Sequence, residues 1–185
     1  MPGGTPGGIG AAATATPGGG RQVARGSDGV IWLAWVEQQA VPTQWKVRAA
    51  RSGAYTWGFF VEDVSGILAA QPKGLSICVD TSERPVVLYT LSGSTTVFVW
   101  RKESGTWTAK AGFTTTTQAI ESIQVLCASG GTFHAIYGDF DAGRMFLRHR
   151  TSAALASWSA ATSVTNTSGV AGEVEKNRQV AAGLD

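Results

Sequence analysis

The chain has 185 residues, of which 43% are apolar and only 15% are charged, and its formal net charge is +2. A charge this small, with no run of lysine and arginine, argues against a nucleic-acid-binding protein. No basic and apolar secretion signal is visible in residues 1–20, and no stretch is apolar enough for a membrane span. The low charge is typical either of a Thr/Ser/Gly-rich β surface or of surfaces covered by neighbouring proteins.

Residues 1–20 form an arm rich in glycine, proline, alanine and threonine. The freedom of glycine and the fixed φ of proline disfavour helix and strand alike. We expect this arm to be flexible unless a neighbouring subunit orders it.

From Arg21 onward, short apolar runs alternate with turn signals, and like units follow one another with a period of about fifty residues. The units are predicted at 21–74, 75–122 and 123–176, and residues 177–185 resemble the start of a fourth. Each unit is predicted to hold four strands. These strands are expected at 22–25, 30–37, 45–50 and 58–64; at 75–80, 85–91, 96–102 and 110–115; and at 123–127, 132–137, 144–150 and 160–164.

One aromatic residue closes the second strand of every unit: Trp35, Tyr89 and Tyr137. One aliphatic residue occupies the matching place in every first strand: Val23, Ile77 and Val125. The second strands are apolar at nearly every position, as expected of strands covered on both faces. Four short strands per unit predict an all-β, β-propeller-like fold, with a sandwich or an irregular β-solenoid as the alternative. Propellers need four or more blades, so a longer chain or other subunits would complete the ring.

Two features carry a family resemblance: the blade opening at 21–32, and a polar segment that leads into a tryptophan in each unit. These segments are Arg51–Trp57, Glu103–Trp107 and Thr151–Trp158. They resemble the sialidase-like (BNR or Asp-box) family of β-propellers, whose box usually reads Ser/Thr-x-Asp-x-Gly-x-Thr-Trp. The resemblance implies tight turns at the boxes and tryptophans packed between strands. All three copies lack the aspartate, and the third also lacks the glycine. The family includes enzymes, lectins and scaffolds, so the fold leaves the function open.

Catalysis of the sialidase type would need arginines around a carboxylate, a tyrosine nucleophile paired with an acid, and a separate aspartate. Arg21 stands at a blade opening, but its counterparts Leu75 and Ile123 are apolar. Tyr89 and Tyr137 occupy the repeated aromatic position and are therefore predicted to be core residues. We predict no catalytic residue and a protein that is not an enzyme.

No metal site or cofactor is predicted. Asp139 and Asp141 form a close carboxylate pair, but a hairpin turn is favoured over a calcium loop because further oxygen ligands are missing. Two histidines without paired cysteines do not make a zinc site. Cys78 and Cys127 are predicted to be buried small residues on opposite faces of different units, without a disulfide.

Four aromatic residues fall outside the matched core position and are candidates for stacking on a sugar: Trp45, Tyr55, Trp100 and Phe140. Packing between blades is the alternative for each of them.

The sequence predicts a structural or attachment protein of a large extracellular assembly. Its most specific form is a bacteriophage tail or tail-fibre component whose propeller recognises host-surface glycan. The expected partners are neighbouring subunits and cell-surface glycan, without nucleic acid or membrane insertion, and the expected location is the virion or another extracellular site. The alternative is a fragment of a secreted sialidase-like glycosidase or lectin propeller.

Overall fold

The computed structural model describes residues 23–40, 44–53, 56–115, 120, 122–141, 144–164 and 170–171. Within these ranges it leaves the side chains of 53, 56–59, 140–141, 144–145 and 170–171 undescribed. The predicted arm at 1–20 and the predicted fourth unit at 177–185 lie outside the described residues. Among the residues described, no helix is long and apolar enough to cross a membrane.

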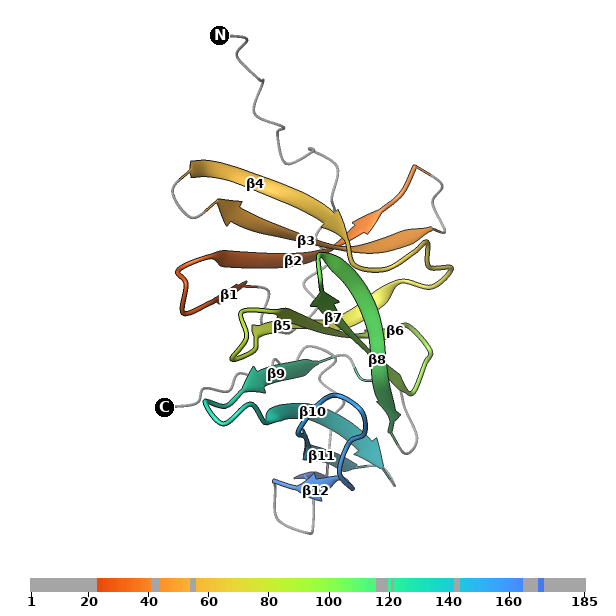
Figure 1. Cartoon of the computed structure of the whole chain (residues 1–185). Helices are drawn as coiled ribbons and strands as arrows, with labels where there is room; N and C mark the ends of the chain where they lie inside the picture. Colours follow the sequence, from red (N-terminus) through yellow and green to blue (C-terminus); the bar gives the residue numbers. More distant parts are fainter. Residues whose placement is uncertain are drawn as a thin grey trace, which may run out of the picture.

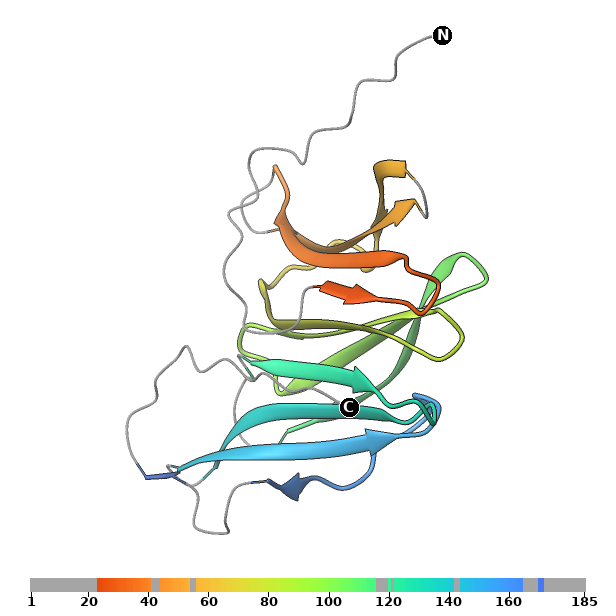
Figure 2. The ribbon, with the colours of Figure 1, turned by 90° about the vertical axis from the view of Figure 1, so that its left-hand side faces the viewer.

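Three antiparallel sheets lie one above another (Figures 1 and 2). We call them blades 1, 2 and 3. Blade 1 has the order β1-β2-β3-β4, blade 2 the order β5-β6-β7-β8, and blade 3 the order β9-β10-β11-β12, with β13 also paired to β11. The bounds are Val23–Arg25, Ile31–Gln38, Trp45–Gly53 and Thr56–Asp63 for β1–β4; Pro72–Val79, Pro85–Leu91, Thr96–Glu103 and Thr106–Thr114 for β5–β8; and Ile123–Cys127, Phe133–Asp141, Arg144–Ser152, Thr162–Ser163 and Val170–Ala171 for β9–β13. The prediction of an all-β fold with four strands to each unit is confirmed.

The first and second strands of each blade are joined by the same turn. One turn residue in each blade has a positive φ: Gly29 (83°), Glu83 (60°) and Gly131 (80°). Glycine tolerates this conformation, whereas it is unfavourable for glutamate. The Glu83 carboxylate accepts hydrogen bonds from the Ser27 hydroxyl and from the Ser27 backbone N–H, the latter at 3.2 Å. The strained turn of blade 2 is therefore held against the turn of blade 1.

The first strands of the three blades are neighbours in space. β1 packs against β5, and β5 packs against β9. The Ser76 hydroxyl of β5 accepts a hydrogen bond from the Val125 backbone N–H of β9 at 3.0 Å. The first strands of neighbouring blades therefore lie side by side, as the inner strands of a propeller do.

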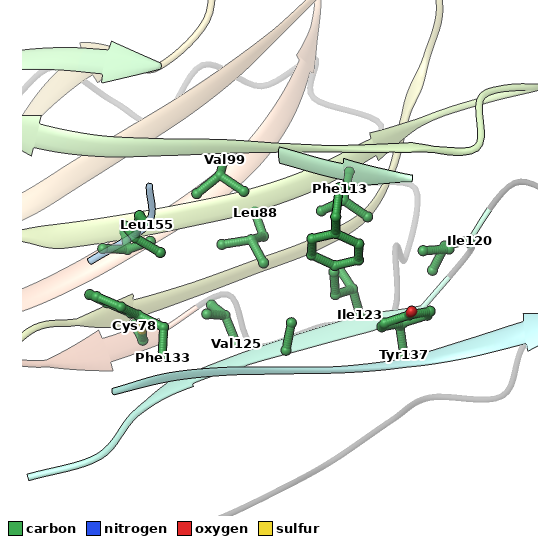
Figure 3. Close-up of a cluster of buried hydrophobic side chains, with 13 residues drawn as sticks. Cys78, Leu88, Val99, Phe113, Ile120, Ile123, Val125, Phe133, Tyr137 and Leu155 are labelled. Carbon is green, nitrogen blue, oxygen red and sulfur yellow. The ribbon is translucent and has the colours of Figure 1, made fainter. Parts of the chain in front are cut away.

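Two apolar clusters fill the spaces between the blades. One lies between blades 1 and 2 and contains Tyr89, and the other lies between blades 2 and 3 and contains Tyr137. Figure 3 shows the second cluster, in which Leu88 and Val99 of blade 2 lie opposite Val125 and Tyr137 of blade 3. Tyr89 and Tyr137 are 1% and 0% exposed, so their predicted core role is confirmed.

Each blade has two faces, which we name from these contacts. The forward face packs on the next blade and the rear face packs on the preceding one. Five matched positions make up the forward face: Ala24, Trp32, Ala34, Val47 and Ala49 in blade 1; Cys78, Val86, Leu88, Val97 and Val99 in blade 2; and Leu126, His134, Ile136, Leu147 and His149 in blade 3. Three matched positions make up the rear face: Val23, Leu33 and Trp35; Ile77, Val87 and Tyr89; and Val125, Ala135 and Tyr137.

The tryptophans of the box-like segments clamp neighbouring blades together. Trp107 of blade 2 donates its indole N–H to the Glu62 carboxylate of blade 1 at 2.9 Å and meets Trp32 edge-on. Trp158 of blade 3 donates to the Ala111 carbonyl of blade 2 at 2.8 Å. Each ring therefore ties its own blade to the preceding one, although neither segment has the aspartate of the family's box.

Candidate functional site

The four candidate sugar-binding aromatics do not converge on one place. Trp45 begins β3, after the connection from β2, and Phe140 lies near the end of β10, before the equivalent connection to β11. These two residues therefore belong to the same end of the fold by topology. Trp100 lies in the middle of β7. Tyr55 and the side chain of Phe140 are outside the description.

Trp45 is anchored through its backbone. Its N–H donates to the Leu68 carbonyl at 2.9 Å, and its carbonyl accepts from the Leu68 N–H at 2.8 Å. Its side chain is half-buried and does not belong to either apolar cluster. A ring held in this way keeps part of its surface available for stacking on an apolar sugar face.

Trp100 has a packing role. Its ring lies against the cluster between blades 1 and 2, and its side chain hydrogen-bonds to Tyr89. Burial raises the pKa of Tyr89, although the hydrogen bonds from Trp100 and Ser65 act in the opposite direction. This placement favours the packing alternative over a sugar-binding role for Trp100.

A polar network lies on the rear face of blade 1, at the same strand ends as Trp45 but on the opposite side of the sheet. Lys46 and Asp63 form an ion pair at 2.6 Å, and Arg48 bridges Glu37 and Asp63 at 3.0 and 3.1 Å. Charged side chains fixed in this way present hydrogen-bonding groups of both signs at the end of blade 1.

The two buried aspartates among the described residues are both held near arginines. The Asp80 carboxylate, 3% exposed, accepts from the Ser82 and Arg84 backbone N–H groups and from the Arg84 guanidinium at 2.8 Å. The Asp139 carboxylate, also 3% exposed, lies 3.8 Å from the Arg148 guanidinium. β10 continues through Asp141, which pairs with Arg144, so this predicted carboxylate pair belongs to a β-hairpin.

Tyr137 is enclosed rather than presented to solvent. Its hydroxyl accepts a hydrogen bond from Arg150 Nε at 3.0 Å, and its ring lies against Phe113. Burial raises the pKa of Tyr137 against the opposing effect of Arg150. A buried phenol with a raised pKa is poorly suited to act as a nucleophile.

The two histidines meet on the forward face of blade 3, which sequence reasoning missed. His134 Nδ1 and His149 Nε2 are 3.0 Å apart. The ring planes differ by 8° and the centroids are 5.2 Å apart. The centroid separation is about what the 3.0 Å N···N distance becomes when the radius of each ring is added to it. The rings therefore lie end to end in nearly one plane and share an N–H···N hydrogen bond. Their matched positions in blade 2 are Val86 and Val99, so only the β10–β11 register could have revealed the pair.

The histidine pair predicts weaker stability in mild acid. Burial, and then the charge of His134, lowers the pKa of His149 below 6.5, so the unfolded chain binds the proton more readily. The contribution of His149 to the free energy of unfolding should therefore be complete above pH 6.5. It should be lost as the pH falls from 6.5 through the lowered pKa. Urea titrations at several pH values between 8 and 5 test this expectation. His149→Gln should flatten the dependence in this interval, and an equally steep dependence in that variant would contradict the assignment.

No group of three or more histidine, cysteine, aspartate and glutamate side chains gathers as a metal site within the described ranges. Cys78 and Cys127 are not joined in a disulfide: Cys78 is buried and Cys127 is half-buried. They lie on opposite faces of their blades, as predicted, yet both contact the cluster between blades 2 and 3. The opposite faces of successive blades confront each other, which the sequence argument did not consider.

Two blade faces are incompletely buried. On the rear face of blade 1, Val23 is 49% exposed and Trp35 is half-buried, whereas the matched residues of blades 2 and 3 are at most 1% exposed. On the forward face of blade 3, four of the five positions are only half-buried: His134, Ile136, Leu147 and His149. The matched positions of blades 1 and 2 are at most 5% exposed.

The fold defines the chain as a β-propeller-like all-β protein. No family model matches it, and no curated protein matches its sequence. A protein of unknown function from Dyadobacter fermentans is similar in structure, with a TM-score of 0.61 and 14% identity over 77% of this chain and 40% of that one. An α-L-arabinofuranosidase variant from Fusarium graminearum, in complex with an iminosugar inhibitor, has a TM-score of 0.54 and 14% identity over 77% of this chain and 48% of that one. The chain thus spans less than half the length of these solved structures, and the likeness concerns the fold alone.

Proposed function

We propose that the chain is a non-enzymatic attachment protein, which contributes blades to a glycan-recognising propeller in a large extracellular assembly. The observation that carries this proposal is the pair of incompletely buried faces on blades 1 and 3. Positions that are buried in both internal junctions are only half-buried there, apart from the exposed Val23 and the buried Leu126, and incompletely covered apolar surfaces mark sites of protein association. The chain is therefore suited to work beside neighbouring subunits.

Glycan recognition is the part of the proposal that rests on Trp45. The Trp45 indole is half-buried and lies outside both apolar clusters, so part of the ring is available as a stacking surface on the forward face of blade 1. Sugar rings have apolar faces, and such a face can stack on this indole.

The absence of catalysis is also proposed. A glycosidase of the usual kind needs two carboxyl groups that flank the scissile bond. Asp80 and Asp139 are buried beside arginines, and Tyr137 is enclosed by its neighbours. These groups support the folded structure and offer no accessible acid and nucleophile.

A bacteriophage tail or tail fibre is the assembly that we favour. The low charge of the chain and its Gly/Pro-rich arm at 1–20 support a subunit that is surrounded by others. Descent from sialidase-like propellers belongs to the same proposal and is supported by the two tryptophan clamps between blades.

We expect the chain to bind polysaccharide on an array of bacterial surface glycans, and Trp45→Ala to weaken that binding about tenfold. A stacking contact contributes about 0.5–1.5 kcal/mol, and 1.4 kcal/mol corresponds to tenfold. Phe60→Ala is the matched control, because Phe60 is 58% exposed but lies in the outer strand β4. No binding by the unaltered chain, or equal losses in both variants, would contradict the assignment. Hydrolysis of chromogenic glycosides by the unaltered chain would overturn the non-enzymatic part.

A further inference from the structure

We infer that the partner of the incompletely buried faces is a second copy of this chain, joined head to tail so that two chains close one six-bladed ring. This inference rests on the proposed role of the chain in an assembly and names the partner. It follows from the repeat, because the two internal junctions show which surface each blade face fits.

Each internal junction has the same composition. The forward face of blade 1 packs on the rear face of blade 2, and the forward face of blade 2 packs on the rear face of blade 3. Ile77 and Val125, on the inner strands, are 0% exposed in these junctions. A rear face of this repeat is therefore shaped to receive a forward face of the same repeat.

The chain has one face of each type left over among its described residues. The rear face of blade 1 exposes Val23 by 49%, although it matches Ile77 and Val125. The forward face of blade 3 leaves Ile136 half-buried, although the matched Leu88 is 0% exposed. Since the two surfaces are of complementary type, one molecular species can cover both of them.

The arithmetic of closure favours two copies. The three sheets of the described residues give six in a pair of chains, which lies within the usual range of four to eight blades, whereas three alone lie below it. A head-to-tail contact uses two different surfaces, and it closes into a ring when repeated rotation returns to the start. The similar solved structures are more than twice as long as the portion that this chain matches, which leaves room for a second set of blades.

The chemistry of the two faces is compatible. The rear face of blade 1 carries an internal ion-pair network, in which Arg48 is bound to both Glu37 and Asp63. On the forward face of blade 3, His134 and His149 satisfy each other through their shared hydrogen bond. Arg25, at the exposed end of β1, is the further charge on the rear face of blade 1, and among the described residues the forward face of blade 3 adds none when the imidazoles are neutral.

Light scattering of the purified chain tests the inference. We expect a mass twice the 19.3 kDa of one chain. Val23→Glu should reduce it to that of one chain, because a carboxylate would be buried at the junction. Ile67→Glu is the matched control: Ile67 is 61% exposed, lies outside both faces, and should leave the mass doubled. A single-chain mass for the unaltered protein, a dimer insensitive to Val23→Glu, or an open polymer would each overturn the closed pair.

Cross-linking tests the register of the junction. In the internal junction, Lys102 of blade 2 contacts Glu62 of blade 1. By the strand registers, Ser52 of blade 1 matches Lys102, and Thr162 of blade 3 matches Glu62. In the proposed junction, Ser52 of one chain should therefore lie close to Thr162 of the other. A short bismaleimide should join Ser52→Cys chains to Thr162→Cys chains when the two are mixed, in a background that lacks the half-buried Cys127.

Cross-linking of either variant with itself, and not with the other, would overturn the head-to-tail arrangement. The head-to-tail pair and the glycan-binding function can be contradicted independently of each other. A monomer that binds glycan would remove this inference and leave the proposed function, whereas a dimer that binds no glycan would do the reverse.

Discussion

Tyr137→Ala should lower the free energy of unfolding by about 3–5 kcal/mol, the cost typical of removing a large aromatic side chain from a core. Tyr137 is 0% exposed and belongs to the cluster between blades 2 and 3, where its ring contacts Phe113. Few atoms can move into the space because the surrounding side chains belong to paired strands. A loss of this size is a large part of the stability of an ordinary domain. Urea unfolding followed by circular dichroism measures the effect.

Tyr137→Phe separates the ring from the hydroxyl. It keeps the packing but removes the acceptor of the Arg150 Nε hydrogen bond. Arg150 also donates to the Ser159 and Thr114 carbonyls, so its guanidinium keeps other partners. We expect a loss of about 1 kcal/mol. If Tyr137→Ala cost no more than Tyr137→Phe, the ring would not have the core role assigned to it.

Asp80→Ala should lower the free energy of unfolding by about 3 kcal/mol, because it removes a buried carboxylate and leaves the donors of its hydrogen bonds unsatisfied. The Asp80 carboxylate accepts from two backbone N–H groups and from Arg84, and it lies 3.9 Å from Arg101. Arg101 keeps its ion pair with Glu103, and Arg84 is 40% exposed, so the expected loss comes mainly from the hydrogen bonds that the Asp80 carboxylate accepts from the backbone. Denaturant titration of the variant and of the unaltered chain gives the difference.

Asp28→Ala is the matched control for Asp80. Asp28 lies in the equivalent turn of blade 1, where its exposed carboxylate accepts a hydrogen bond from the Val30 N–H at 2.9 Å. Removing it should cost about 1 kcal/mol or less. The turn itself does not need Asp80, since Gly26 and Ala128 occupy the same place in blades 1 and 3. Equal losses in the two variants would show that Asp80 acts only as a turn residue.

The strands could be read from the sequence because each is marked locally. Alternating or continuous apolar runs are bounded by turn residues, and the observed β6 and β9 have the predicted bounds. Other strands differ at their ends: β5 begins at Pro72 rather than Leu75, and β10 runs on to Asp141 rather than ending at Tyr137. These ends depend on pairing with a neighbouring strand, which local composition does not reveal.

The candidate site was less predictable. Trp45 and Trp100 looked alike in the sequence, since both fall outside the repeated aromatic position. Only the packing of blade 1 on blade 2 placed Trp100 against an apolar cluster and left Trp45 outside it. The Trp107 clamp likewise depends on Glu62 of another blade.

The sequence by itself determined that the chain is all-β and built from repeated units, because strand pairing within each unit joins neighbours along the chain. Which face of each blade is covered was decided only by the tertiary structure. The strand aromatics Trp35 and Tyr137 occupy matched positions, yet one is half-buried and the other is 0% exposed. The physical reason is that the burial of a blade face depends on the blade stacked against it. That contact joins residues far apart in the chain, so the local sequence does not reveal it.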